Sequence, residues 1–289
     1  MSDLHPAAAS GFAAGAETYA KGRPDYPAAL TAWLRDGLRL GPGRSVADLG
    51  AGTGKFTGLL AATGAGVTAI EPVDAMRARL AAALPGVTAL AGSAEAMPLA
   101  EASLDALVCA QAFHWFSTPA ALAEIRRVLA VGGRLGLVWN VRDESTPWVA
   151  ELTTIMNAHE GDAPRYHTGA WRRLFPAEGF GPLHEESIPH GHRGTPEQVI
   201  LDRTLSVSFI AALPEAERAR VAQAVRDLIA RTPELAGRDE VTFPYRTQVY
   251  WCERVAQDSL LQDRYPPDHP GARLAENPGS INADDARSG

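Results

Sequence analysis

The chain has 289 residues, of which 46% are hydrophobic and 21% are charged, with a formal net charge of -7 at pH 7. This length and apolar content suffice for one large α/β domain with an elaboration, or for two modest domains, and exclude disorder over most of the chain. The negative charge and the lack of a lysine-arginine run argue against a general nucleic-acid binder, because phosphate contacts need a basic face.

Cysteine use and hydropathy predict a cytoplasmic protein that does not enter a membrane. Cys109 and Cys252 both lie in apolar runs, which suits reduced core thiols better than a disulfide framework. No basic stretch precedes an apolar segment at the start, and no apolar run approaches the roughly 18 residues that span a bilayer. The sequence shows no cluster of metal-binding residues, so we expect no metal.

The first elements expected along the chain are two helices separated by a proline turn. Residues 8–21 are rich in alanine but interrupted by Gly11 and Gly15, which predicts a mobile helix. Two prolines within 22–27 stop helix formation and favour an extended turn. Residues 28–40 follow with apolar side chains at helical spacing, and we expect this helix to cover a sheet.

From residue 46 onward, short apolar runs alternate with helical stretches. Strands are predicted at 46–49, 67–70, 87–91, 104–109 and 134–140. Helices are predicted at 54–62 and 74–83, and a third begins at Thr118, a good helix cap before Pro119. This alternation is typical of a parallel sheet with helices packed on it.

Beyond residue 141 the pattern becomes more aromatic, and we interpret it as a substrate wall built from Trp148, Met156, Tyr166, Trp171, Phe175 and Phe180. Strands at 182–190 and 241–254 enclose two helical stretches, 195–212 and 215–231, which predicts an inserted helical cap. A tail rich in Pro, Asp, Asn and Gly should be disordered. The predicted parts are a lid helix and turn (1–27), a nucleotide-binding core (28–140), a substrate-binding and cap region with the last two strands (141–255), and the tail (256–289).

A glycine turn directly after the first predicted strand indicates a ligand site. Gly50, Gly52 and Gly54 leave a backbone that can take positive φ and let a ligand approach closely. The third glycine comes one residue earlier than in the dinucleotide fingerprint, which argues against NAD. Glu71 ends the next strand, where a doubly wound fold places a carboxylate on ribose hydroxyls. A nucleoside ligand is therefore expected.

These residues resemble motifs I and II of the class I S-adenosylmethionine-dependent methyltransferases, whose turn reads Asp/Glu-x-Gly-x-Gly-x-Gly, here Asp48 to Gly54. The resemblance covers about residues 12–140 well and the cap less securely. It implies a Rossmann-like fold, with a mostly parallel seven-stranded sheet, helices on both faces and a helical cap inserted before the last strand. It also implies S-adenosylmethionine as the cofactor.

The resemblance further implies where that cofactor is held. The loop after the third strand holds the adenine, although Ser93 stands where aspartate is commoner, and a leader tyrosine and arginine lie over the methionine end. The predicted cofactor-binding residues are Tyr19, Arg23, Asp48, Gly50, Ala51, Gly52, Gly54, Glu71, Pro72, Met76, Ser93, Ala94, Glu95 and Gln111.

His114 is the candidate catalytic residue, because it follows the fourth strand within an aromatic run and an imidazole titrates near neutral pH. It is interpreted either as a general base or as a residue that orients the substrate. The run from Gln111 to Phe116, with the leader and the cap, resembles the small-molecule branch that contains trans-aconitate methyltransferase. If the acceptor is a carboxylate, it is already ionised and needs no base.

Arginine grips carboxylates bidentately, so Arg142, Arg165, Arg173 and Arg203 are candidate anchors for such an acceptor. The predicted substrate-binding residues are His114, Trp115, Asn140, Arg142, Trp171 and Arg173. We expect methyl transfer to a carboxylate or hydroxyl oxygen of a small molecule. The alternatives are carbon methylation of a quinone-like or aromatic ring, and a regulator that binds the cofactor without turnover. The sequence leaves monomer and homodimer open.

Overall fold

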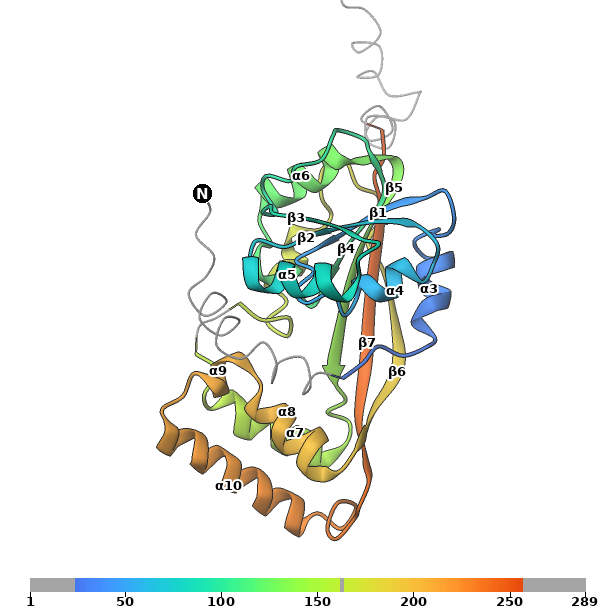
Figure 1. The fold of residues 1–289 in the computed structure, drawn as a ribbon. Coiled ribbons are helices and arrows are strands. Elements are labelled where there is room, and N and C mark those ends of the chain that lie inside the picture. Colours follow the sequence, from blue (N-terminus) through green and yellow to red (C-terminus); the bar gives the residue numbers. More distant parts are fainter. Residues whose placement is uncertain (1–23, 162–163, 257–289) are drawn as a thin grey trace, which may run out of the picture. The chain divides into compact units, whose positions relative to one another are not determined.

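The computed structural model describes residues 24–161 and 164–256, and seven strands in this part of the chain form one sheet in the order β3-β2-β1-β4-β5-β7-β6 (Figure 1). The strands are β1 (Ser45–Leu49), β2 (Gly66–Ile70), β3 (Thr88–Leu90), β4 (Leu104–Ala110), β5 (Leu129–Arg142), β6 (His184–Gly194) and β7 (Val241–Glu253). The predicted helix at 8–21, Tyr19, Arg23 and almost all of the predicted tail lie outside the described residues.

The first five strands pair in parallel and β7 runs in the opposite direction to its two neighbours, which confirms the predicted Rossmann-like architecture. β1 pairs in parallel with β2 and β4, β2 with β3, and β4 with β5. β7 runs antiparallel to both β5 and β6. Because parallel strands end at the same edge, the segments that follow β1, β2, β3, β4 and β5 gather along one edge of the sheet.

Two apolar layers bury the sheet on opposite faces. Helices α3 (Leu30–Asp36) and α4 (Thr57–Ala61) pack on one face, through residues such as Trp33 and Leu60. Leu80 of α5 (Asp74–Ala83) packs on Ala51 and Ala69. Helix α6 (Pro119–Val128) packs on the other face, as predicted with Thr118 as its cap, whose hydroxyl accepts from the Ala121 N–H at 3.1 Å.

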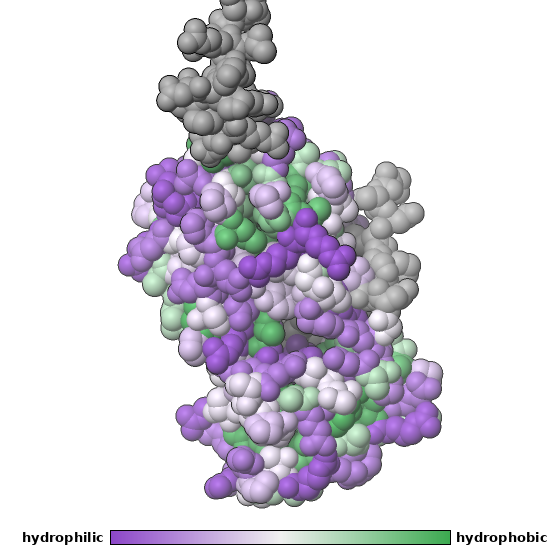
Figure 2. All heavy atoms as spheres, turned by 180° about the vertical axis from the view of Figure 1, so that it is seen from behind, coloured by the Kyte–Doolittle hydropathy of each residue, from purple (hydrophilic) through white to green (hydrophobic). Residues whose placement is uncertain are grey.

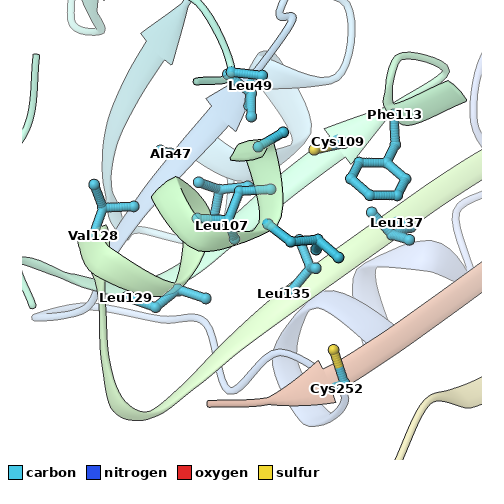
Figure 3. Packing of buried hydrophobic residues seen from close by; sticks show 14 of the residues in the cluster. Ala47, Leu49, Leu107, Cys109, Phe113, Val128, Leu129, Leu135, Leu137 and Cys252 are labelled. Carbon is cyan, nitrogen blue, oxygen red and sulfur yellow. The ribbon is translucent and has the colours of Figure 1, made fainter. Parts of the chain in front are cut away.

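The second layer contains both cysteines and is shown in Figure 3. Cys109 on β4 and Cys252 on β7 are fully buried and carry free thiols. Phe113 of the short 3-10 helix η1 (Phe113–Trp115) points into the same layer, beside Leu137. The loop after β4 is therefore anchored in the core.

The cap comprises α7 (Pro147–Asn157) and the elements from η3 to α10, and has an apolar core of its own. The predicted helix at 195–212 is divided into a π-helix η3 (Glu197–Asp202), α8 (Arg203–Leu205) and α9 (Ser208–Ala211), and α10 is Glu215–Arg231. The long strands β6 and β7 extend past the rest of the sheet and reach the cap (Figure 1). Phe243 and Tyr245 of β7 belong to the apolar core of the cap.

Figure 2 shows hydrophilic residues over most of the face seen there, with hydrophobic residues in small separate patches. Among large hydrophobic side chains of the described residues, only Val131 is exposed. No helix in residues 24–161 or 164–256 has the length and apolarity to cross a bilayer.

Candidate functional site

A cavity of about 240 Å³ lies at the edge of the sheet where β1, β2, β4 and β5 end. It contains the glycine turn after β1 and the loops after β2, β3 and β4. Of the predicted cofactor-binding residues, those that line it are Asp48, Gly50, Ala51, Gly52, Glu71, Pro72, Met76, Ser93, Ala94, Glu95 and Gln111. Residues far apart in sequence thus meet in one pocket because the parallel strands end together.

Glycine is needed at the three positions of the turn for different physical reasons. A Cβ on Gly50 would lie 2.8 Å from the Ala112 Cβ, and one on Gly54 would lie 2.9 Å from the Leu80 side chain. Packing therefore requires glycine at both positions. Gly52 has a φ of +58°, and a Cβ there would meet nothing within 4 Å. Because Gly52 also lines the cavity, its bare backbone offers a surface that a ligand can approach.

Asp48 is a buried carboxylate in the wall of this cavity. Its Oδ2 accepts from the Thr57 hydroxyl at 2.6 Å, while its Oδ1 has no hydrogen-bond partner among the described residues. Burial raises its pKa from an ordinary 3.8 to about 7, the Thr57 hydrogen bond opposes this, and nearby Glu71 adds to it. A buried acceptor without a partner is costly, so Asp48 suits a ligand that brings a cation or a donor.

Glu71 is held in place by the backbone. Its Oε2 accepts from the Gly52 N–H at 2.8 Å and its Oε1 from the Val73 N–H at 2.9 Å. Burial raises its pKa, and these two hydrogen bonds counteract the effect. Each carboxylate oxygen can accept a second hydrogen bond, which leaves capacity for ribose hydroxyls. Glu71 therefore also stabilises the glycine turn.

The loops after β3 and β4 complete the cofactor side of the cavity. Ser93 and Ala96 form an isolated antiparallel bridge, and the Met97 N–H donates to Glu124 Oε1 at 2.7 Å, so the loop after β3 is tied to α6. Gln111 has a φ of +58°, unusual for a residue with a side chain, and its N–H donates to the Val138 oxygen. Such strained positions cluster at functional sites.

His114 does not line the cavity. The indole N–H of Trp139 donates to His114 Nδ1 at 3.1 Å, so in a neutral imidazole the proton is on Nε2. Trp139 is fully buried, and this bond attaches the loop after β4 to the core. The contact favours an orienting role for His114, because the neutral ring offers a donor at Nε2 rather than a lone pair.

The other predicted substrate residues separate into two groups. Trp115, Asn140 and Arg203 line the cavity. Arg142, Trp171 and Arg173 do not: Arg142 Nε donates to Thr153 at 2.9 Å, Arg173 is exposed, and Trp171 is buried in the sheet core.

Four of the six residues interpreted as a substrate wall are buried in the core instead. Trp148 and Met156 are buried in the apolar core of the cap, and Phe180 is buried in the same layer as Trp171. Trp171 has ring contacts with Trp139 and Tyr250 at 4.7 and 4.9 Å. Their large apolar surface is used for packing of the protein itself.

Arg165 pairs with Glu160 at 2.9 Å, and its guanidinium lies over the rings of Trp115 and Phe209. It therefore joins the loop after β4 to the cap.

Sequence reasoning missed the part of the wall supplied by the leader and by the end of the glycine turn. Pro24, Tyr26, Lys55 and Phe56 all line the cavity. Lys55 Nζ pairs with Asp25 Oδ1 at 2.9 Å, and the ring of Tyr26 meets Phe56 edge-on with centroids 5.0 Å apart. The only available signal was that Lys55 directly follows the glycine motif.

The residues present fit S-adenosylmethionine. The cofactor carries positive sulfonium and ammonium groups, and three acidic residues, Asp48, Glu71 and Glu95, line the cavity. Gly52 gives a surface without a side chain, and the unpartnered Asp48 Oδ1 gives a buried acceptor. Among the described residues, no group of three side chains could hold a metal ion.

Comparison with known proteins gives the same assignment. Residues 47–137 match the family described as "Methyltransferase domain". An uncharacterised methyltransferase-like protein of Schizosaccharomyces pombe is 38% identical over 240 residues, covering 82% of this chain and 92% of that protein. An uncharacterised methyltransferase of Mycobacterium tuberculosis is 40% identical over 236 residues, with the same coverage of 82% and 92%.

A solved structure described as a candidate type II methyltransferase from Anaeromyxobacter dehalogenans superposes with a TM-score of 0.59 at 26% identity, covering 80% of this chain and 97% of the other. The family assignment is supported by the order of the strands in the sheet, by the glycine turn, by Glu71 after β2 and by these relatives. The chain belongs to the class I S-adenosylmethionine-dependent methyltransferases.

Proposed function

We propose that the protein transfers the methyl group of S-adenosylmethionine to a carboxylate or hydroxyl oxygen of a small molecule. The observation that carries this proposal is that the acidic cofactor side shares one cavity with Tyr26, Trp115, Asn140 and Arg203. A site lined by the leader, the sheet and the cap suits a small acceptor better than a polymer. The formal charge of -7 also disfavours nucleic acid.

We assign the cofactor contacts to the residues that the cavity brings together. The methionine end would be held by Asp48, Gly50, Ala51, Gly52 and Gln111. Glu71, Pro72 and Met76 would hold the ribose and its surroundings, and Ser93, Ala94 and Glu95 the adenine. The bound cofactor supplies an electrophilic methyl group on its sulfonium. Tyr19 and Arg23 remain proposed contacts from the leader.

The chain's own residues have to position the acceptor and exclude water, because the methyl group is already activated. Aromatic side chains of Tyr26, Phe56, Trp115 and Phe116 line the cavity and would exclude water once the ligands are bound. We propose that His114 and Trp115 shape the acceptor side, with His114 orienting rather than removing a proton. This role suits a carboxylate acceptor, which is ionised at neutral pH.

Two further relatives act on acceptors of different kinds, as their names state. The malonyl-[acyl-carrier protein] O-methyltransferase of Methylococcus capsulatus is 38% identical over 136 residues, 44% of this chain and 48% of that protein. The demethylmenaquinone methyltransferase of Mycobacterium bovis is 32% identical over 174 residues, 60% of this chain and 68% of that protein. The first favours oxygen methylation, and the second, with the aromatic lining, favours a quinone-like ring as the alternative acceptor.

We further propose that residues 28–140 bind the cofactor and that 141–255 shape the acceptor side, as monomer or homodimer. The test is calorimetric titration with S-adenosylmethionine and S-adenosylhomocysteine, followed by a cofactor-consumption screen over small carboxylic acids, phenols and quinones. Micromolar binding with turnover on acids or phenols supports the proposal. Turnover on quinones alone favours the alternative, and cofactor binding with no turnover on any class points to a regulator.

A further inference from the structure

The charged residues that line the cavity are divided by sign. Asp48, Glu71 and Glu95 lie at the ends of β1 and β2 and in the loop after β3, whereas the positively charged residues are Lys55 and Arg203. The acidic side matches a cationic methyl donor. The donor also carries one carboxylate, at its methionine end, whereas the basic side has two cations, so this side has positive charge left for a second ligand that is anionic.

The strand order places this basic side at the acceptor end. If the proposed function is correct, on which this inference rests, the adenine, ribose and methionine lie along the ends of β3, β2, β1 and β4. The next strands in the sheet are β5, β7 and β6. Asn140, near the end of β5, lines the cavity, and its Oδ1 accepts from the Thr247 hydroxyl of β7 at 2.6 Å. The acceptor therefore lies over these three strands.

Lys55 is directed to that end through the leader. Its ammonium pairs with Asp25 at 2.9 Å, and the Asp25 backbone oxygen accepts from Asn140 Nδ2 at 3.1 Å. On β6, His190 hydrogen-bonds to the Asp25 backbone. The charges of Lys55 and Arg203 both act on the neighbouring His192. The two cations that line the cavity, Lys55 and Arg203, thus lie near His192, which is outside the cavity lining.

The two imidazoles are both partly buried, and burial disfavours their charged form. Burial lowers the pKa of both His190 and His192 below 6.5, and Lys55 lowers each further. A neutral imidazole keeps one N–H, and that of His190 is already used by the Asp25 backbone, so His192 is the ring that can donate to an anion without adding charge.

Arg203 is placed by an unusual local structure. The residues immediately before it, Glu197–Asp202, form a π-helix, and Arg203 begins α8. π-helices are rare and occur frequently at functional sites. Val199, Ile200 and Leu201 are all buried, so the π-helix is fixed in the cap while Arg203 reaches the cavity wall.

We propose that Arg203 and Lys55, with His192 beside them, form a subsite that binds a carboxylate of an organic-acid acceptor. The planar guanidinium offers two parallel donors to a carboxylate, and the ammonium contributes charge. This subsite anchors the acceptor, whichever of its atoms receives the methyl group.

The test is calorimetric titration of the protein saturated with S-adenosylhomocysteine. Succinate is the anionic probe, succinamide is its neutral counterpart, and inorganic phosphate tests whether the subsite takes any anion. The variants are Arg203→Met, Arg203→Lys and the control Arg220→Met. Arg220 is an arginine of the cap whose side chain is 76% exposed on α10, outside the cavity wall.

We expect succinate to bind at least about tenfold more tightly than succinamide, and Arg203→Met to lose at least about tenfold of that affinity. Arg203→Lys should fall between wild type and Arg203→Met, since it keeps the charge but loses the paired donors. Arg220→Met should match wild type. Phosphate binding as tight as succinate would overturn the assignment of the subsite to a carboxylate.

Equal affinities for succinate and succinamide, no binding of either, or a normal succinate affinity in Arg203→Met would overturn the inference. The S-adenosylhomocysteine titration keeps two failures apart. If the wild-type protein does not bind S-adenosylhomocysteine, the proposed function is overturned, and this inference with it. If it binds S-adenosylhomocysteine but not succinate, only the subsite is overturned. An S-adenosylhomocysteine affinity of Arg203→Met that equals the wild-type value also shows that this variant is folded.

Discussion

The substitution Asp48→Asn should stabilise the cofactor-free protein above neutral pH. Burial raises the pKa of Asp48 from 3.8 to about 7, so the folded state holds a proton over a pH range in which the unfolded state has released it. Stability from this group is complete below about pH 4 and is lost as the pH rises to about 7. Asparagine does not titrate and therefore keeps its contribution at every pH.

The magnitude follows from the structure. The interval from 3.8 to about 7 exceeds three pH units, and each unit costs about 1.4 kcal/mol, so the ionised carboxylate destabilises the fold by about 4 kcal/mol at pH 8. Asparagine can still accept from Thr57, but its amide replaces Oδ1, which has no partner among the described residues. That unpartnered group costs roughly 1–3 kcal/mol. The net gain at pH 8 is roughly 1–3 kcal/mol.

Urea denaturation of wild type and Asp48→Asn, without cofactor, at pH 5 and at pH 8 measures this effect. The difference in unfolding free energy should move in favour of the variant by about 3 kcal/mol between the two pH values. S-adenosylmethionine affinity should fall in the same variant, because a charge next to the bound cation is lost. A stability difference that is the same at both pH values would refute the reasoning.

Four further substitutions test other parts of the site. Glu71→Gln should weaken S-adenosylmethionine binding by roughly 1–3 kcal/mol in calorimetry, because charge-assisted hydrogen bonds are lost, and an unchanged affinity would remove the ribose assignment. Gly52→Ala should reduce cofactor affinity by about tenfold or more. Gly54→Ala should mainly lower the free energy of unfolding in urea, because its Cβ would lie 2.9 Å from a Leu80 carbon. Similar effects from the two variants would contradict the different surroundings of the two glycines. Trp139→Phe removes the donor to His114 and should lower turnover roughly tenfold with little change in cofactor affinity, and full activity would show that this hydrogen bond does not orient the imidazole.

Local patterns in the sequence were sufficient for the elements and for the cofactor side. Strand and helix periodicities depend on side chains a few residues apart, so β1, β2 and β4 appear in the sequence almost as they occur in the fold. The carboxyl ends of parallel strands meet by geometry alone, which is why Asp48 and Glu71 could be predicted to share a site.

The acceptor side could not be predicted in the same way. Trp171 and Trp115 look alike in sequence, yet Trp171 is buried against Trp139 and Trp115 lines the cavity, because only packing decides which surface an aromatic ring covers. The helical periodicity of 195–212 likewise did not reveal the π-helix that precedes Arg203.

The sequence by itself therefore determined the doubly wound sheet, the glycine turn and the acidic residue after β2, since each depends on short-range spacing. Only the tertiary structure decided that the Trp139 indole N–H donates to His114 Nδ1, that Lys55 forms an ion pair with Asp25, and which arginine lines the cavity. Those outcomes depend on contacts between residues that lie far apart in the sequence, such as Asn140 with Asp25, and no local pattern carries that information.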